Sequence, residues 1–439
     1  MIKQIIFIFC LLISLSVFTF SVTRIFRYFK HTRPAFPVRD LKKRFRLMLE
    51  VAFGQTKIFR KPVVGFFHAL VFWGFCVILF GSLEMVIDGA CGTEKALTFS
   101  GPVYSLITAS GDIFSGLVTI SILIFLIRRL FFHIRRFEGS EMKPVSHQDA
   151  ILALFLILFL MISLLGMNIS YIACQKQTDQ PVEGLFPLSM LLVGLFSGAS
   201  AVTCFHVQEV FWWSHILLIF LFANILPYSK HFHVFMSVPN VFLSRLIPPG
   251  KISTMESITR EVLLMLDPAS LSSIANPDAP VERFGVKDVE DISWKNYLDA
   301  LSCTECGRCT AACPANLTGK KLSPRKIMMN VRERMKEKGP GLLKTGHSYE
   351  DQRSLLRHYI SEEELWACTT CNACVTECPI NINHPEIILN MRRYLVMEEA
   401  SAPSGLKSVF HNMENNGAPW QFSQEDRLQW AKDLKLRIP

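Results

Sequence analysis

Charged residues are scarce in this 439-residue sequence. Asp, Glu, Lys and Arg together make up 19% of it, whereas apolar residues make up 50%, and the mean hydropathy is +0.30. So little charge argues against a single soluble globule and indicates a membrane part. The apolar excess lies before about residue 235, and residues 250–439 have the ordinary composition of a water-soluble domain. The chain is therefore predicted to have two parts.

The sequence also lacks the basic, aromatic-interleaved patches that are typical of nucleic-acid binding. Its net charge is +9, but residues 24–61 alone hold twelve Lys or Arg against Asp40 and Glu50, which accounts for the whole surplus. A basic loop between two apolar runs is typical of the cytoplasmic face of a membrane protein. We therefore expect contact with membrane lipid and no nucleic-acid partner.

Apolar runs long enough to cross a bilayer are residues 4–23, 62–87, 112–130, 149–169 and 208–229. A sixth run, 186–205, contains Pro187, Gly194 and Gly198, and we interpret it as a re-entrant or interfacial helix. Loops 24–61 and 128–148 are basic, whereas the alternate loops hold few basic residues. Five spans then place the N-terminus outside and everything after Lys230 in the cytoplasm. This predicts a multi-pass protein of the cytoplasmic membrane.

Strand patterns and recognisable acid–base or nucleophilic sites are also missing, but cysteine is not. Eight of thirteen cysteines form two copies of C-x2-C-x2-C-x3-C-P, a run that binds [4Fe-4S] cubanes and whose fourth cysteine serves the other cluster. The predicted ligand sets cross between the copies. They are Cys303, Cys306, Cys309 and Cys378 for one cluster, and Cys368, Cys371, Cys374 and Cys313 for the other. Structural zinc is the alternative, although zinc sites usually pair two C-x2-C hooks.

The fifty-odd residues between the two cysteine motifs place apolar residues at helical spacing, in 323–339 and 351–368. We therefore predict an all-α fold: a five-span transmembrane helix bundle followed by a cytoplasmic α-helical ferredoxin-like domain. The expected parts are a membrane domain (1–235), a linker with surface helices (236–294), a two-cluster domain (295–398) and a partner-docking tail (399–439). Cys91 and Cys174 fall in the two outer loops, where a disulfide could persist. The sequence does not decide whether the two form one.

Histidines in the apolar half are candidate functional residues, because a polar ring inside a bilayer is costly. His68 lies in the second run, and His215 and His233 are eighteen residues apart, five helical turns, so they share a face. These two ligands on one face lie at opposite membrane depths, and each could meet a ring from a facing helix and hold haem iron between the two imidazoles. Packing and helix–helix hydrogen bonding are the alternative roles, above all for His68.

These residues carry a family resemblance. The PYSKHFH stretch (227–233), with His215 upstream, resembles the dihaem cytochrome b subunit of respiratory nitrate reductase and the membrane subunit of heterodisulfide reductase. The stretch from DISWKNYLDALSCTECGRC (291–309) to NINHPEI (381–387) resembles the heterodisulfide reductase iron-sulfur subunit. It is also similar to fused membrane iron-sulfur oxidoreductases that link electron-transfer flavoprotein to quinone.

The resemblance implies that His68 and His233 ligate a haem b on the cytoplasmic side. It assigns His215 to a second, outer haem, but Ile78 stands where the nitrate reductase pattern has a histidine, so His215 alternatively lines a quinone pocket. Residues 401–439 resemble the linker that precedes cysteine-rich CCG domains in the fused relatives. We expect that module to be a separate subunit that docks on this tail.

Together these patterns predict an oxidoreductase subunit that relays electrons between quinone or quinol, haem b, two [4Fe-4S] clusters and a cytoplasmic partner, either the CCG subunit or electron-transfer flavoprotein. Outer polar residues near the membrane, including His206, Glu209, Glu84 and Asp88, are candidates for quinone protons. One alternative is a membrane-anchored iron-sulfur docking or redox-sensing module without haem or quinone chemistry. Another keeps the relay but makes the membrane half a passive anchor.

Overall fold

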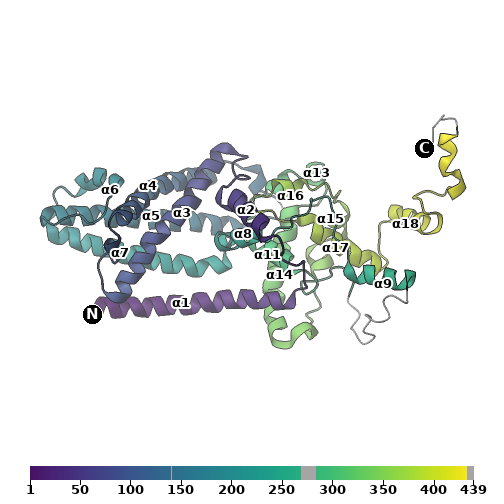
Figure 1. Cartoon of the computed structure of the whole chain (residues 1–439), viewed down its shortest axis with the longest axis horizontal. Helices are drawn as coiled ribbons and strands as arrows, with labels where there is room; N and C mark the ends of the chain where they lie inside the picture. The colour runs from purple at the N-terminus through teal and green to yellow at the C-terminus, as the bar shows by residue number, and fades with distance from the viewer. Residues whose placement is uncertain (140, 268–282, 433–439) are drawn as a thin grey trace.

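The computed structural model describes residues 1–139, 141–267 and 283–432. Within these ranges the secondary structure is helical, with two isolated β-bridges and no β-strand. Figure 1 shows a bundle of long helices at one end of the molecule and a group of shorter helices packed against the other end of that bundle. The predicted all-α fold is confirmed.

Among the described residues, five helices are long and apolar enough to cross a membrane. They are α1 (Ile2–Tyr28), α3 (Pro62–Cys91), α4 (Pro102–Phe131), α5 (Pro144–Gln177) and α7 (Ala201–Ile225). The middle three begin with proline, whose missing N–H is tolerated in a first helical turn, and the Ser200 side chain caps α7. The five predicted spans are confirmed, and they indicate a multi-pass membrane protein.

The sixth apolar run does not form a spanning helix. It contains the short helix α6 (Pro187–Leu192), a 3-10 turn (Val193–Phe196) and the first residues of α7. The carboxylate of Asp112 on α4 is buried and accepts hydrogen bonds from the backbone N–H groups of Leu188 (2.7 Å) and Ser189 (2.9 Å). A buried carboxylate therefore satisfies free donors at the start of α6 and fixes it against the bundle.

The shorter helices of the C-terminal part follow a loop that leaves the last span. They are α8 (His233–Phe242), α9 (Glu256–Leu266), α11 (Trp294–Ser302), α12 (Arg308–Ala311), α13 (Pro314–Leu317), α14 (Pro324–Thr345), α15 (Glu362–Trp366), α16 (Ala373–Glu377), α17 (His384–Met397) and α18 (Ser404–Asn416). Capping boxes start α11 and α15, where Ser293 pairs with Asn296 and Ser361 with Glu364.

The two parts of the chain share one hydrophobic core. Tyr28 at the end of α1 and Phe232 after the last span are buried in the same cluster as Ile327 and Met335 of α14. Figure 1 shows α1 running along the bundle to reach α14. Because apolar burial continues across the boundary, the C-terminal part is packed onto the bundle and does not hang from a flexible tether.

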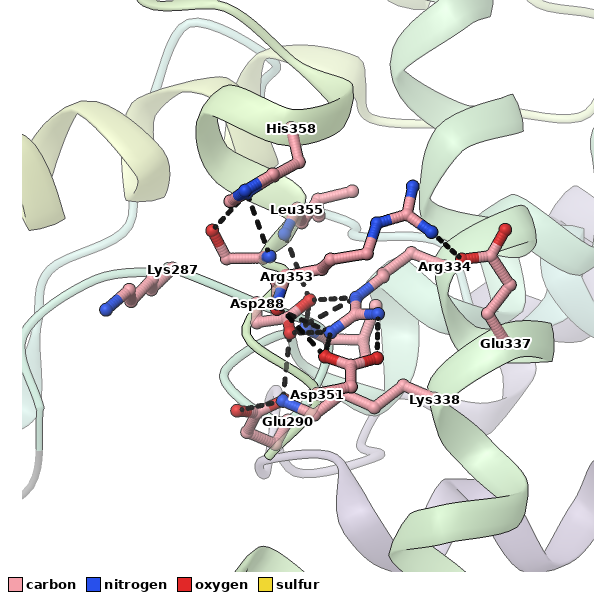
Figure 2. Close-up of polar contacts among 12 residues, drawn as sticks. Lys287, Asp288, Glu290, Arg334, Glu337, Lys338, Asp351, Arg353, Leu355 and His358 are labelled. Atoms are coloured by element: carbon pink, nitrogen blue, oxygen red, sulfur yellow. Dashed lines mark hydrogen bonds and ion pairs between the residues drawn. The ribbon is translucent and has the colours of Figure 1, made fainter. Parts of the chain in front are cut away.

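A buried ionic network fixes the segment before α11 to α14 (Figure 2). Arg334 donates to the carboxylates of Asp288 and Asp351, and Lys338 donates to Asp288 and Glu290. Arg334 and Asp288 are almost fully buried. This network places residues 283–293 inside the C-terminal part, although the predicted domain bounds themselves stay a prediction.

Candidate metal centres

The two cysteine motifs form matching loops. In each, the second and fourth residues after the first cysteine have positive φ: Glu305 and Gly307 in one loop, Thr370 and Asn372 in the other. Each loop then enters a short helix, α12 or α16. At Gly307 an added Cβ would lie 2.6 Å from the carbonyl oxygen of Arg136, so the close approach of another loop adds to the requirement for glycine.

One predicted ligand set surrounds a single cavity. Cys313 comes from the first motif and Cys368, Cys371 and Cys374 from the second, and all four line a space closed by Pro324, Pro385 and other apolar residues. Burial raises the pKa of Cys374 to about 12, and the charges of Cys368, Cys313 and Cys371 raise it further. The cavity therefore fits a group whose positive charge offsets several thiolates.

The other predicted set is also brought together. Burial raises the pKa of Cys309 well above its usual value, and the charges of Cys306, Cys303 and Cys378 act in the same direction. Cys378 comes from the second motif, and the structure places it near Cys306 and Cys303 of the first. Its role as a cluster ligand stays a prediction. In the described part of the chain, no three His, Cys, Asp or Glu side chains are close enough to hold one metal ion.

The two sets differ in their exposure. Cys303, Cys309 and Cys378 are buried, whereas Cys371 is exposed and Cys368 is partly exposed. The buried set lies beside the membrane part, because Lys57, just before α3, donates to the carbonyl oxygen of Cys378 (3.2 Å). We call the buried set the inner set and the one that contains Cys371 the outer set.

Basic side chains hold the backbone of both cysteine loops. Arg332 donates to the carbonyl oxygen of Cys303 (2.9 Å), and Arg392 donates to that of Cys368. Arg308, next to Cys309, donates to the carbonyl oxygen of Lys57 (3.0 Å) and so ties the inner loop to the basic loop of the membrane part. Sequence reasoning missed these positioning residues, because their partners are 24 to 251 positions away in the chain.

His68 and His233 lie near each other, at the end of the bundle that contacts the C-terminal part. Burial lowers the pKa of His233 to about 3, and the neighbouring rings of His231 and His68 lower it as well. The Nδ1 atom of His233 is 3.2 Å from the carbonyl oxygen of Lys230, and the Nδ1 atom of His68 is buried without a partner.

His215 is buried within the bundle. Its Nδ1 atom lies 3.0 Å from the carbonyl oxygen of Leu160 and 2.9 Å from the hydroxyl of Ser163, while its Nε2 atom is buried without a partner. A histidine that is oriented through one ring nitrogen and free at the other has the arrangement of a metal ligand.

The candidate proton-handling residues have structural partners. Asp88 accepts hydrogen bonds from the backbone N–H groups of Lys95 and Ala96 (both 2.9 Å), and Glu84 accepts one from Leu97 (3.0 Å). Glu209 pairs with Lys3 at 2.6 Å, and His206 is exposed. Cys91 and Cys174 are both free thiols, so the structure contains no disulfide between them.

Comparisons with known proteins agree with the cysteine motifs. Residues 302–382 match a 4Fe-4S dicluster domain, and a second model with the same description matches residues 269–318. The chain combines membrane-spanning helices with a dicluster domain for two [4Fe-4S] clusters. No solved structure matches the chain.

Curated relatives extend over the membrane part as well. The chain is 28% identical to the probable iron-sulfur-binding oxidoreductase FadF of Bacillus subtilis (strain 168), over 89% of this chain and 55% of that protein. It is also 28% identical to the EtfAB:quinone oxidoreductase of Syntrophomonas wolfei, over 88% of this chain and 53% of that protein. The chain therefore spans about half the length of these relatives.

The predicted likeness to an iron-sulfur component of heterodisulfide reductase is confirmed. The chain is 29% identical over 154 residues to one component of the dihydromethanophenazine:CoB–CoM heterodisulfide reductase of Methanosarcina acetivorans, and the match covers 34% of this chain and 37% of that protein. The likeness of the spans to the nitrate reductase cytochrome stays a prediction.

Proposed function

We propose that this protein is a membrane-bound electron-transfer subunit of an oxidoreductase complex. It relays electrons between quinone or quinol, haem b and two [4Fe-4S] clusters, and exchanges them with a cytoplasmic partner. The observation that carries the proposal is the packing of the inner cysteine set onto the end of the helix bundle where His68 and His233 meet. This packing supports a haem site and a cluster site that lie side by side.

The residues present fit a haem. In the proposed assignment, His68 and His233 hold one haem b at the cytoplasmic end, and His215 either binds a second haem deeper in the bundle or lines a quinone pocket. When bound, haem b and each cubane would gain and lose one electron at a time. The carbonyl oxygens of Leu160 and Lys230 orient the imidazoles of His215 and His233, and His215 is also buried.

The cytoplasmic orientation is part of the proposal. Arg60 of the basic loop 24–61 donates to the carbonyl oxygen of Thr376, and Arg325 of α14 is paired with Glu141 of the basic loop 128–148 at 2.6 Å. Both basic loops thus contact the dicluster domain. Because basic loops mark the cytoplasmic face, the clusters face the cytoplasm and the N-terminus lies outside.

Partners follow from the relatives and the exposed outer set. One relative is named an EtfAB:quinone oxidoreductase, which supports a quinone on the membrane side and electron-transfer flavoprotein as a soluble partner. A CCG-domain subunit is the second soluble candidate. Cys371 is exposed, so the outer cluster is within reach of such a partner.

Optical and electron paramagnetic resonance spectra of the purified protein test the haem assignment. We expect a b-type haem spectrum and two interacting [4Fe-4S] signals, with haem lost when His68 or His233 is replaced by Ala. His206→Ala is the matched control, because His206 is exposed on the same helix as His215. Unchanged haem content in both ligand variants would contradict the assignment.

The same preparation separates the alternatives. Clusters without any b-type absorption would favour the docking or redox-sensing module. A haem-replete protein whose clusters are not reduced by added quinol would instead favour the passive membrane anchor. Zinc in place of iron would remove the relay altogether.

A further inference from the structure

The helix α2 (Leu41–Met48) lies in the basic loop between the first two spans, at the end of the bundle and beside α8 (Figure 1). One face of it is fixed to the protein. Arg44 is buried and donates to the carbonyl oxygens of Ser244 (2.7 Å) and Phe242 (3.1 Å), just after α8. Leu47 and Met48, on the same face, pack against the core around Val241.

A second face of the segment is apolar and uncovered. Leu41, Phe45, Leu49 and Phe53 follow one another at four-residue intervals, through α2 and the π-turn after it (Leu49–Phe53). Their exposed fractions are 61%, 53%, 46% and 38%. The stripe continues into the membrane part, because the rings of Phe53 and Phe72 of α3 lie 5.9 Å apart and Trp73 donates to the carbonyl oxygen of Phe53 (2.8 Å).

The third face is basic. Lys42, Lys43 and Arg46 are exposed, and at 100° per residue they follow the apolar stripe around the helix, opposite the buried Arg44. In the described part of the chain, their acidic partners are Asp40, 4.0 Å from Lys43, and Glu50, 2.9 Å from Arg46, and both pairs are solvent-exposed. Exposed pairs of this kind leave the cationic groups available to another anion.

We propose that α2 lies in the membrane interface, with its apolar stripe among the upper acyl chains and its basic face on anionic lipid headgroups. A protein-facing side, a lipid-facing side and a headgroup-facing side in this order are what an interfacial helix beside a membrane protein requires. The apolar stripe is continuous with a spanning helix, and its charge complements an anionic leaflet.

This contact has a structural consequence. The segment after α2 carries Lys57 and Arg60, which hold the backbone of α16 next to Cys378. We call this segment, which carries Lys57 and Arg60, the strap. Anionic lipid bound to α2 therefore stabilises the strap, which holds the inner cysteine set against the membrane part. This inference does not depend on haem or quinone, so its test is separate from that of the proposed function.

A photocrosslinking experiment tests the lipid contact. Full-length protein with Phe45→p-benzoylphenylalanine is placed in nanodiscs of equal phosphatidylcholine and phosphatidylglycerol, irradiated, digested and analysed by mass spectrometry. We expect lipid adducts on the peptide that contains residue 45. Phosphatidylglycerol adducts should be favoured roughly 5-fold or more, which corresponds to the contribution of one basic side chain near an anionic surface. Leu41 is the second probe position.

Matched variants make the result specific. Lys42→Gln, Lys43→Gln and Arg46→Gln together should bring the adduct ratio to that of the bilayer, whereas replacement of the exposed Lys320, Lys344 and Lys407 by Gln should leave the preference intact. Phe410 is an exposed residue of α18, and Figure 1 shows α18 beyond the dicluster helices, away from the bundle, so the probe at Phe410 should give no lipid adduct. Absence of lipid adducts at both 41 and 45, or equal capture of both lipids, would overturn the proposal.

Discussion

His384, the first residue of α17, illustrates how burial of one ring makes stability depend on pH. It is 1% exposed, and burial lowers its pKa to about 3. In the unfolded chain the ring takes up a proton near pH 6.5, so below that pH the unfolded state binds more protons than the folded state. The stability of the folded state therefore falls as pH decreases from about 6.5 towards 3.

We expect this single group to lower the free energy of unfolding by roughly 1 kcal/mol between about pH 7.5 and about pH 5.5. Thermal unfolding midpoints of the purified protein across that interval measure the effect. His384→Gln should flatten the pH dependence, whereas His411→Gln should not, because His411 is exposed. Equal slopes in the two variants would show that His384 is not the responsible group.

Arg334 provides the second prediction at the residue scale. Its guanidinium is buried between Asp288 and Asp351 (Figure 2), so Arg334→Met would leave the buried carboxylate of Asp288 with Lys338 as its remaining cation. We expect a loss of roughly 3 kcal/mol or more in the free energy of unfolding. Chemical denaturation checks this. Lys321→Met, at the exposed pair with Glu363, should have little effect, and a similar loss in both variants would contradict the reasoning.

At the scale of elements, the sequence predicted what depends on local pattern. The five apolar runs predicted the five long helices, because length and hydropathy determine a candidate span. The C-P spacing indicated that Cys313 belongs to the ligand set of the second motif and Cys378 to that of the first. Which face of α2 packs on the protein and the contact between Lys57 and Cys378 were not predictable. Lys57 and Cys378 are 321 positions apart, and only the packed fold brings them together.

The contacts of Lys57 in the strap give a prediction for the inner cluster. The Nζ atom of Lys57 contacts the carbonyl oxygens of Val375 and Cys378, so its charge lies close to the inner set. A nearby positive charge favours the reduced, more negative cluster.

Lys57→Met should therefore lower the midpoint potential of the inner cluster by on the order of tens of millivolts, and Lys57→Arg should largely retain that potential. Redox titration followed by paramagnetic resonance measures the potential, and an unchanged value in Lys57→Met would exclude this electrostatic role.

At the scale of the whole molecule, burial orders the relay. The inner set lies against the bundle with three of its four cysteines buried and Cys306 partly exposed, whereas the outer set is exposed to solvent at Cys371. In the proposed relay, electrons from the membrane reach the inner cluster before the outer one, because Lys57 of the membrane part contacts the carbonyl oxygen of Cys378 in the inner set. His68 and His233, the proposed haem ligands, lie near each other at the end of the bundle that contacts the inner set, which supports this order.

Two cysteine variants test this order. In protein reconstituted with a quinol, Cys371→Ala should remove the outer cluster and leave quinol-driven reduction of the inner cluster. Cys306→Ala should remove the inner cluster and stop reduction of the outer one, because no cofactor would then bridge the distance from the bundle. Iron analysis establishes which cluster remains, and Cys91→Ala, at an exposed thiol outside both sets, is the control. Quinol reduction of the outer cluster at the normal rate in Cys306→Ala would show that electrons enter the dicluster domain by another route.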